Sequence, residues 1–232
     1  MEFTNSLIKG KLIKRYKRFF ADIKLDKEIV TAHCPNTGSM KGLLDVGNEV
    51  YISKNNNPKR KLKYTLEIIK VKENLVGVNT HFANKIAYHA LVNNLVKEVS
   101  NNDKIKPEVF FDKETRFDFL VEKNKQKIFI EVKNVTLFRD NKVAEFPDSV
   151  TTRGSKHLKT LITAIKSGYK SYLLFLVQIQ GVESFKIAKD IDKEYYENYL
   201  LAKKAGVIFL AYRCKINSKE IKIEKKIKII ND

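Results

Sequence analysis

The sequence predicts a two-domain α/β protein, with an all-β N-terminal part and a mixed α/β C-terminal part. The chain has 232 residues, of which 43% are hydrophobic, which suits one large domain or two small ones. Residues 1–82 contain short strand patterns that are separated by turn residues. Residues 83–232 alternate helical patterns with strand patterns. The two parts are therefore expected to be separate domains.

The N-terminal part contains short strand patterns and at most one helical turn. The strands are separated at residues 26–27, 35–42 and 55–58, which are rich in turn-forming residues. About five short strands in a segment of this length are typical of a small closed barrel of the OB type. Such barrels commonly bind single-stranded nucleic acid along a basic groove, with bases stacked on aromatic side chains.

Basic and aromatic residues cluster in this N-terminal part. The basic candidates for contacts with nucleic acid are Arg15, Lys17, Arg18 and Arg60. The aromatic residues either stack on bases or fill the barrel core, and they are Tyr16, Phe19, Phe20, Tyr51 and Tyr64.

The C-terminal part begins with a helix that Asn84 should cap and that should run to about Val99. Three strand patterns follow, EVFF, RFDFLVE and KIFIEVKNV, and the turn KNKQ joins the last two. A charge-rich linker through EFPDSV precedes the helix pattern TRGSKHLKTLITAIKSG, which Gly168 should terminate. The apolar run YLLFLVQI predicts a strand that is buried on both faces. A further helix and strand complete this part.

The chain is strongly basic. Its formal net charge is +18, because 45 lysines and arginines face only 27 acidic residues. This charge favours a polyanionic partner, and we predict DNA, either single- or double-stranded. An AT-rich genome is the alternative explanation for the many lysines, although it does not explain the shortage of acids. The sequence leaves open whether the protein forms a homodimer.

Several function classes find no support in the sequence. The chain has no long apolar run and no signal-peptide pattern, so we expect a cytoplasmic protein. Cys34 and Cys214 match no zinc-binding spacing and are not expected to form a disulfide in a reduced cytosol. The absence of a GxGxxG motif or a P-loop argues against a small-molecule cofactor and against an enzyme of sugar metabolism.

Three charged residues on neighbouring strand patterns form the candidate active site. In IFIEVKN the side chains alternate, so that Glu131 and Lys133 share one face. In RFDFL, Phe117 and Phe119 should share a face and Asp118 should point the opposite way, toward Glu131 if the strands form a hairpin. Two carboxylates that meet on a sheet need a cation between them, and Mg²⁺ or Mn²⁺ suits oxygen ligands.

Asp118, Glu131 and Lys133 would be the catalytic residues of a phosphodiester hydrolase. Lys133 beside the metal would orient or deprotonate the attacking water. An exposed hairpin face without a metal is the alternative, but both strands are too apolar to face solvent. The order helix, three strands, helix, strand is also the core of the restriction-endonuclease-like, or PD-(D/E)xK, nucleases. The pair Pro147-Asp148 follows the Glu-x-Lys and is therefore not the acid of this motif.

Seven stretches of the sequence stand out, and two of them contain the long and unusual blocks HCPNTGSM and FPD-x-VT-x-RG-x-KHL. They are RYKRFFADI, HCPNTGSMKG, VNTHFAN, TRFDFL, IEVKNVTL, FPDSVTTRGSKHL and AGVIFLAY. Together they resemble the sugar fermentation stimulation protein (SfsA) family, over nearly the whole chain. The resemblance implies an OB-type N-terminal domain, a nuclease-like C-terminal domain, DNA binding and a regulatory link to sugar catabolism.

The resemblance also implies roles for individual residues. Asp118 and Glu131 would be the metal ligands, and Lys133 would be the catalytic lysine. The residues that would approach the phosphate are Arg116, Arg153, Lys156 and His157. The last three precede or open a helix, whose free N–H groups favour an anion. For His157, a place on the helix surface is an equal alternative.

The chain departs from the family pattern around this site. His89 stands on the first helix where the pattern often has Glu, and Thr152 and Ser155 replace an acid and an amide. Such changes would leave a site that binds metal but cuts poorly. Two hypotheses therefore remain: a metal-dependent DNA nuclease, and a non-catalytic DNA-binding regulator of sugar catabolism genes. The HCPNTGSM loop has turn residues but no catalytic base, so we expect it to touch nucleic acid or the domain interface.

Overall fold

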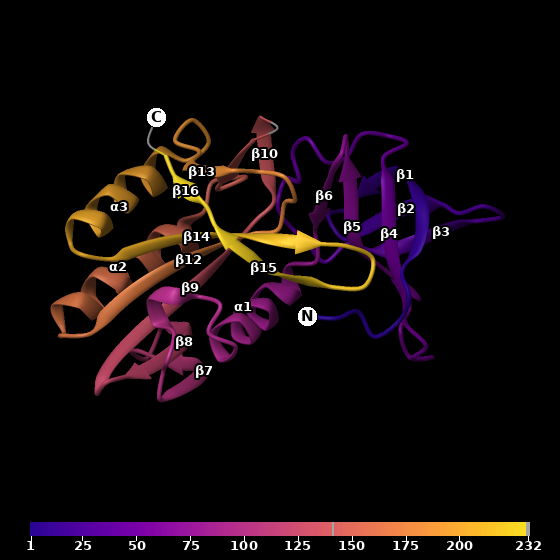
Figure 1. Cartoon of the computed structure of the whole chain (residues 1–232). Coiled ribbons are helices and arrows are strands. Elements are labelled where there is room, and N and C mark those ends of the chain that lie inside the picture. The colour runs from indigo at the N-terminus through magenta and orange to yellow at the C-terminus, as the bar shows by residue number, and fades with distance from the viewer. Residues whose placement is uncertain (141, 231–232) are drawn as a thin grey trace.

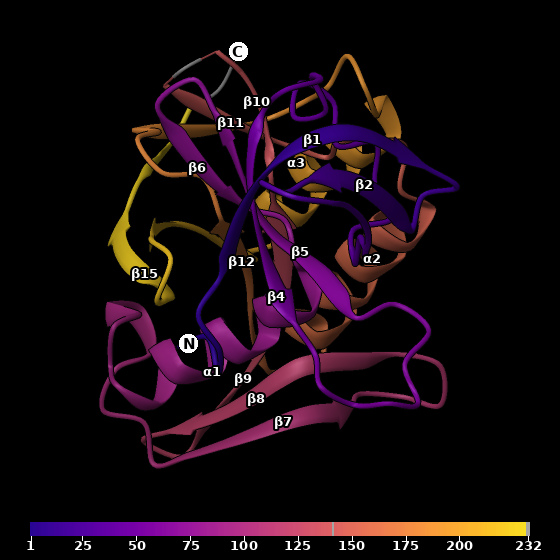
Figure 2. The same ribbon diagram turned by 90° about the vertical axis from the view of Figure 1, so that its right-hand side faces the viewer.

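The computed structural model describes residues 1–140 and 142–230. An N-terminal barrel is joined to a C-terminal mixed sheet with helices, which confirms the predicted two-domain α/β fold class. Figure 1 shows the barrel at the right, the mixed sheet at the left, and helix α1 (Ala83–Val92) between them. Figure 2 shows the barrel strands in front of the larger sheet. No helix in the described ranges is long and apolar enough to cross a membrane.

The N-terminal sheet closes into a barrel. Its strands are β1 (Ile8–Tyr16), β2 (Phe20–Lys24), β3 (Ile29–His33), β4 (Glu49–Lys54), β5 (Tyr64–Val71) and β6 (Asn74–Gly77). They are arranged in the order β3-β2-β1-β4-β5-β6. An additional parallel pairing of β3 with β5, at Ala32–Tyr64 and His33–Thr65, closes the first five strands. The closed barrel confirms the OB-like prediction.

The C-terminal domain is built on a six-stranded sheet of order β15-β14-β12-β9-β8-β7. Its strands are β7 (Lys104–Phe110), β8 (Arg116–Lys123), β9 (Gln126–Val135), β12 (Lys170–Val177), β14 (Ile208–Ile216) and β15 (Ile221–Lys226). Strands β9, β12 and β14 are parallel, whereas β7, β8 and β15 run antiparallel to their neighbours. Helix α1 packs on one face, while α2 (Thr152–Lys166) and α3 (Lys193–Lys204) pack on the other. This is the predicted order of helix, three strands, helix and strand.

Helix α1 is shorter than the sequence predicts. It begins after Phe82, not after a capping Asn84, and it ends at Val92. Asn94 adopts a left-handed backbone with φ of 57°, and the N–H of Leu95 donates to the carbonyl of Ala90 at 2.8 Å. This pattern is a Schellman cap, which asparagine tolerates better than most residues. Two short 3-10 turns flank this helix in the sequence. The turn η1 (Thr80–Phe82) comes before α1, and η2 (Lys97–Val99) comes after it.

The expected charge-rich linker is not a linker. It forms strands β10 (Leu137–Asp140) and β11 (Val143–Phe146), which join β13 (Ser184–Ile187) and β16 (Lys228–Ile229) in a small second sheet. The charged residues of this segment suggested an exposed linker, but in the structure they form ion pairs with one another, which allows part of the segment to be buried. Arg139 donates to both oxygens of Glu145, at 2.6 and 2.7 Å, and Glu145 is only 3% exposed.

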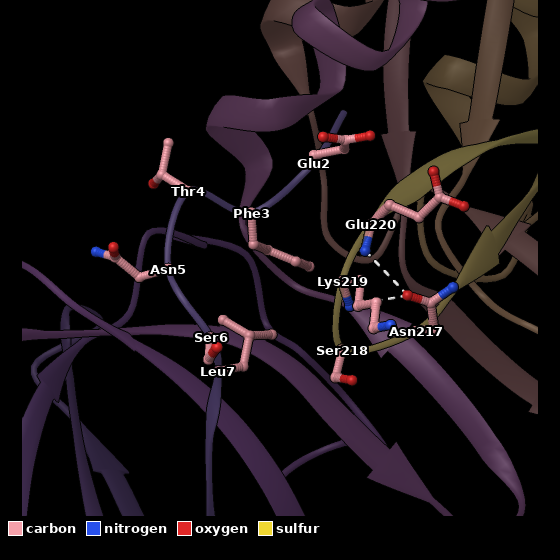
Figure 3. A pocket seen from close by; sticks show the side chains of 10 residues that line it. All are labelled: Glu2, Phe3, Thr4, Asn5, Ser6, Leu7, Asn217, Ser218, Lys219 and Glu220. Carbon is pink, nitrogen blue, oxygen red and sulfur yellow. Dashed lines mark hydrogen bonds between the residues drawn. The ribbon is translucent and has the colours of Figure 1, made fainter.

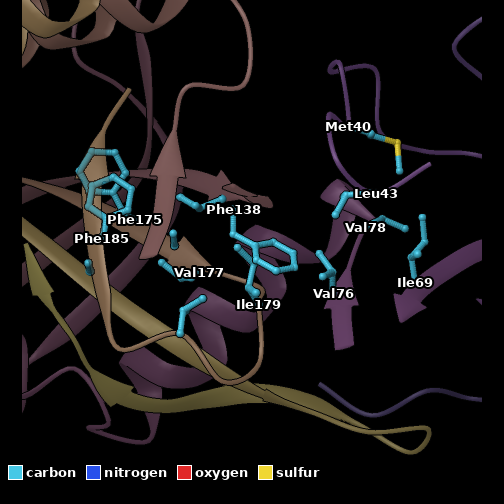
Figure 4. Close-up of a cluster of buried hydrophobic side chains, with 14 of the residues drawn as sticks. Met40, Leu43, Ile69, Val76, Val78, Phe138, Phe175, Val177, Ile179 and Phe185 are labelled. Atoms are coloured by element: carbon cyan, nitrogen blue, oxygen red, sulfur yellow. The ribbon is translucent and has the colours of Figure 1, made fainter. Parts of the chain in front are cut away.

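One hydrophobic cluster joins the barrel to the C-terminal domain. In Figure 4 the side chain of Val76, from β6 of the barrel sheet, approaches Phe138 and Ile179 of the C-terminal domain, while Val78 lies on the barrel side beside Leu43. Val76 and Ile179 also form an isolated β-bridge. The N–H of Gly77 donates to the carbonyl of Gln178 at 2.9 Å. The two domains therefore share core and main-chain contacts.

The N-terminal tail crosses from the barrel to the other domain. The N–H of Phe3 donates to the carbonyl of Lys219 at 2.9 Å, and Glu2 forms a β-bridge with Glu220. Figure 3 shows the pocket between this tail and the turn before β15. The pocket has a volume of about 650 Å³ and shares no lining residue with the pocket at Asp118 described below.

Candidate active site

The β8–β9 hairpin positions the candidate active site. Its turn residues, 124–125, have φ values of 49° and 63°, which two-residue hairpin turns require. Main-chain pairing of the two strands ends at Phe119–Ile130. Beyond that point, Oδ2 of Asp118 accepts a hydrogen bond from the N–H of Val132 at 2.7 Å. The Asp118 side chain thus takes the place of a main-chain partner and lies over β9.

This change in pairing separates two phenylalanines. Phe117 packs against Phe111 and Phe129, with ring centroids 5.8 and 5.1 Å away. Phe119 packs into the cluster on the α1 side of the sheet, where Tyr88 lies 6.1 Å away. The expectation that Phe117 and Phe119 share a face is wrong, because the regular alternation of β8 stops where its pairing with β9 stops.

Asp118 is a carboxylate that resists ionisation. Its Oδ1 accepts a hydrogen bond from Nδ2 of Asn84 at 2.7 Å, and its Oδ2 accepts the bond from Val132. Burial, and then the negative charge of Glu131, raise the pKa of Asp118 to about 6, against the opposing effect of both hydrogen bonds and of Lys133. The two predicted acids therefore lie close enough to interact strongly.

Glu131 lies at the centre of the site and is only 3% exposed. Its Oε1 accepts a hydrogen bond from Nζ of Lys133 at 2.7 Å and also contacts Nδ1 of His157. Burial alone would raise the pKa of Glu131, but the positive charge of Lys133 and the hydrogen bond from His157 outweigh it, and the pKa lies below its ordinary value. The Oε2 atom is buried and has no hydrogen-bond partner among the described residues.

These donors suit a hard divalent cation. Asp118 and Glu131 offer carboxylate oxygens, and Oε2 of Glu131 is a buried acceptor to which no described residue donates a hydrogen bond. No group of three or more His, Cys, Asp or Glu residues in the described ranges forms a larger metal cluster. Mg²⁺ is commonly held by one or two carboxylates, with water and substrate phosphate as its other ligands. The residues present therefore fit a Mg²⁺-type ion and do not suggest a zinc centre.

A pocket of about 680 Å³ opens at Asp118. We call it the active-site pocket. The predicted basic residues Arg116, Arg153, Lys156 and His157 all line it. The structure thus brings four of the predicted phosphate contacts together with the predicted metal ligand.

The basic residues of this pocket differ in whether a carboxylate already forms an ion pair with them. Arg116 forms an ion pair with Glu108 at 2.8 Å, and Lys156 forms one with Glu114 at 2.8 Å. Arg153 is exposed, and its Nε lies 3.4 Å from Nε2 of His157. Two of the cations therefore already have a carboxylate where a phosphate would bind.

His157 is not a surface residue of α2. It is 7% exposed, and its Nδ1 lies against Glu131 and 3.3 Å from Nζ of Lys133. Helix α2 points it inward because Leu158 and Leu161 bury the same side of the helix. His157 therefore supports Glu131 directly, which the sequence alone did not reveal.

The first helix contributes Asn84 to the site, not His89. His89 is exposed and does not line the pocket. The sequence pattern gave no sign of this role for Asn84, because an asparagine at a helix start resembles a cap. In α2, Thr152 is exposed, whereas Ser155 is buried with no hydrogen-bond partner for its hydroxyl in the described part of the chain.

The N-terminal basic residues lie apart from the active-site pocket. Arg15 donates to the carbonyls of Asn36 and Arg18, at 2.8 and 3.2 Å, and so supports the loop after β3. Lys17 and Arg18 are exposed in the β1–β2 turn. Arg60 lies in the β4–β5 loop, with Nη2 3.5 Å from Oγ1 of Thr65. None of these four lines the pocket at Asp118.

The HCPNTGSM loop lies at the interface between the domains. Oγ of Ser39 donates to the carbonyl of Asp148 at 2.8 Å, and the N–H of Met40 donates to Oδ2 of Asp148 at 3.4 Å. Oγ1 of Thr80 donates to the carbonyl of Pro35 at 2.7 Å. The Asp of the Pro-Asp pair therefore holds the barrel loop and does not line the pocket at Asp118.

Comparison with known proteins agrees with this architecture. Residues 13–78 match the SfsA N-terminal OB domain, and residues 81–220 match the sugar fermentation stimulation protein RE domain. The chain belongs to the sugar fermentation stimulation protein family. A sugar fermentation stimulation protein homolog from Pelagibacter ubique (strain HTCC1062) is 87% identical to this chain, over 100% of both chains. A homolog from Pseudoalteromonas atlantica (strain T6c / ATCC BAA-1087) is 44% identical over 99% of this chain and 100% of its own.

A solved member of the sugar fermentation stimulation protein family has the same fold. The structure of Pyrococcus furiosus SfsA in complex with Ca²⁺ is 25% identical and covers 100% of this chain and 98% of its own. Its TM-score of 0.89 shows that both domains and their arrangement are shared. The predicted family is therefore confirmed.

Proposed function

We propose that this protein hydrolyses DNA phosphodiester bonds with the help of a divalent cation, Mg²⁺ or Mn²⁺. The observation that carries this proposal is the buried Oε2 of Glu131, which has no hydrogen-bond partner among the described residues, while Lys133 lies 2.7 Å from the other oxygen and the charge of Glu131 helps to raise the pKa of Asp118. The Ca²⁺ bound by the solved relative supports a divalent cation in this family. Residues 1–82 would serve as a DNA-binding domain and residues 83–232 as the domain that carries the reaction.

The side chains of the site have complementary tasks. Asp118 and Glu131 would hold the cation, which supplies positive charge that stabilises the charge developing on the phosphate. Lys133 would orient the attacking water, since its Nζ is already held by Glu131 and lies near His157. His157 keeps Glu131 in place and ionised. Arg153, which has no carboxylate partner among the described residues, would bind a phosphate oxygen.

DNA is the substrate that the charges favour. The net charge of +18 attracts a polyanion, and three basic residues, Arg116, Arg153 and Lys156, line the mouth of the active-site pocket. The OB-like barrel adds a second surface of a kind that binds single strands.

Cleavage assays with single-stranded and duplex DNA test the proposal. Cleavage should require Mg²⁺ or Mn²⁺, and Lys133→Ala should lower the rate by about a hundredfold or more. Lys127→Ala is the matched control, because Lys127 is an exposed lysine on the same strand, and it should cut at the wild-type rate. Cleavage that persists in Lys133→Ala would show that another site or a contaminant cuts the DNA.

A second function has support from a separate observation. Glu108 and Glu114 already form ion pairs with Arg116 and Lys156. The first helix contributes the neutral amide of Asn84 to the site, where an acidic side chain would bind the cation more strongly. A non-catalytic DNA-binding regulator of sugar catabolism genes would keep such a site. DNA binding without cleavage under any divalent cation would favour this function.

A further inference from the structure

A polar pocket on the barrel has the composition of a nucleotide-binding site. It has a volume of about 380 Å³ and lies where β3, β4 and β5 meet the N-terminal tail and the start of α1. It shares no lining residue with the active-site pocket, and the proposed hydrolysis does not use it. We call it the barrel pocket.

Glu67 provides hydrogen-bond acceptors in the barrel pocket. The residue is 3% exposed, and its Oε1 accepts a hydrogen bond from Oγ of Ser53 at 2.6 Å. Its Oε2 accepts one from Nδ2 of Asn79 at 2.8 Å. Each carboxylate oxygen has two lone pairs, so each can accept a further bond from a ligand. This part of the lining therefore suits the N–H groups of a base.

The barrel pocket is also lined by two cationic side chains and two imidazole rings. Arg60 and Lys85 are the cations, and His33 and His81 are the imidazoles. Burial, and then the charge of Arg60 and of His81, lower the pKa of His33, so its neutral form is favoured, and the N–H of that form can still donate to a phosphate oxygen. Such a cluster attracts a phosphate group, and arginine can bind two phosphate oxygens at once.

An aromatic ring completes the barrel pocket. Phe82 lies in its lining, with Nζ of Lys85 5.8 Å from the centre of the ring and Phe3 packed against its edge at 6.0 Å. Aromatic rings beside cations are the usual platform for an unstacked base. The carboxylate of Glu67 suits the hydrogen-bond donors on the edge of a base, the basic residues suit a phosphate, and the ring of Phe82 suits the flat face of a base.

We propose that the barrel pocket binds one unpaired nucleotide of a DNA strand. Arg60 and the two histidines contact its phosphate, and Glu67 accepts hydrogen bonds from its base edge. The base must be unpaired, because pairing occupies the Watson–Crick donors. This proposal rests on the proposed function, since it requires DNA as the partner, and it narrows the substrate to DNA that carries an unpaired segment.

The location of the barrel pocket favours a strand over a free nucleotide. Asn84 lines the active-site pocket, while its chain neighbours Phe82 and Lys85 line the barrel pocket. The two pockets are thus separated by one turn at the start of α1, which Figure 1 places between the barrel and strands β7–β9. This proximity suits a single strand that contacts both pockets.

Fluorescence anisotropy in the presence of a chelator tests the proposal without any cleavage. The probes are a blunt duplex and the same duplex with a short unpaired tail on one strand. We expect the tailed probe to bind about tenfold more tightly, and we expect Arg60→Ala or Glu67→Gln to reduce this ratio to about threefold or less. Lys166→Ala, which removes an exposed charge from the last turn of α2, should keep the wild-type ratio.

The outcomes separate the two proposals. If the ratio of the affinities for the tailed and blunt probes is the same in the wild type, Arg60→Ala and Glu67→Gln, the barrel pocket does not bind the unpaired nucleotide. If the wild type binds neither probe, the proposed function is wrong. Arg60 lies in a loop, so its variant remains decisive if the melting curve shows that Glu67→Gln is not folded.

Discussion

At the scale of single residues, the site depends on a contrast between two carboxyl groups. Glu131 is held ionised by Lys133 and His157, whereas burial and the charge of Glu131 raise the pKa of Asp118 to about 6. A cation that binds both oxygens removes this repulsion. Cation binding must therefore compete with a proton on Asp118.

The affinity for the cation should depend on pH in one direction. With a pKa of about 6, Asp118 is protonated below that pH, so Mg²⁺ affinity should fall about tenfold for each further pH unit and level off above it. Calorimetric titration between about pH 5 and about pH 8 measures this dependence. Asn84→Ala removes a hydrogen bond to the ionised form and should move the midpoint upward. An affinity that is constant across this range would contradict the assigned ligand.

The three central residues could be predicted from sequence because strand alternation and a short turn fix them. Glu131 and Lys133 share a face by alternation alone, and the turn at 124–125 sets the pairing of β8 with β9 as far as Phe119–Ile130, one residue from Asp118 and from Glu131. His157 and Asn84 could not be assigned in the same way. Their contacts depend on how α2 and α1 rotate against the sheet, and that rotation is set by packing between distant segments.

At the scale of elements, short segments that looked like loops hold the domains together. The sequence predicted the barrel strands and the order of the C-terminal core, whose patterns are strongly periodic. It did not predict β10 and β11, because the ion pair of Arg139 with Glu145 has no periodicity that a strand pattern reveals. The contact of Ser39 with Asp148, 109 residues apart, was equally hidden.

The loop contact with Asp148 makes a quantitative prediction. A Cβ on Gly38 would overlap the carboxylate of Asp148, whose Cγ lies 3.0 Å from its position. Gly38→Ala should therefore lower the free energy of unfolding by about 1–3 kcal/mol. Asp148→Ala removes the overlapping group and a weak hydrogen bond, at a cost of about 1 kcal/mol.

A double-mutant cycle in urea separates this overlap from other effects. The double variant should be more stable than the sum of the two changes implies, by about 1 kcal/mol. Strictly additive losses of unfolding free energy would mean that the added Cβ at position 38 does not overlap the carboxylate of Asp148.

At the scale of the whole molecule, the two domains form one body. The cluster in Figure 4, the bridge of Val76 with Ile179 and the tail contact at Lys219 all cross between them. The sequence placed the domain boundary at residues 82–83 but gave no sign of these contacts, since each joins segments far apart in the chain.

The shared core should make unfolding cooperative. We expect one calorimetric transition for the full chain, with equal calorimetric and van't Hoff enthalpies. Val76→Ala leaves a cavity in the joint cluster and should shift that transition downward without splitting it. Two resolved transitions in the wild type would show that the interface contributes little.

DNA binding should weaken steeply with salt. Each phosphate contact on a duplex releases about 0.9 counterion, so a plot of log affinity against log salt has a slope that counts these contacts. Arg153→Ala should make the slope shallower by about 1, because its guanidinium group lines the active-site pocket. A slope near zero for the wild type would contradict a polyanionic partner.

The bridge between β6 and Ile179 has a consequence for the products of the reaction. A hinge between the domains would let the distance from barrel to Asp118 vary, but this bridge and the surrounding core fix it. Under the two proposals, the protein would bind an unpaired nucleotide in the barrel pocket and cleave the strand at a fixed distance from it. Nicks should fall at a constant number of nucleotides from the unpaired segment, whatever the sequence between them.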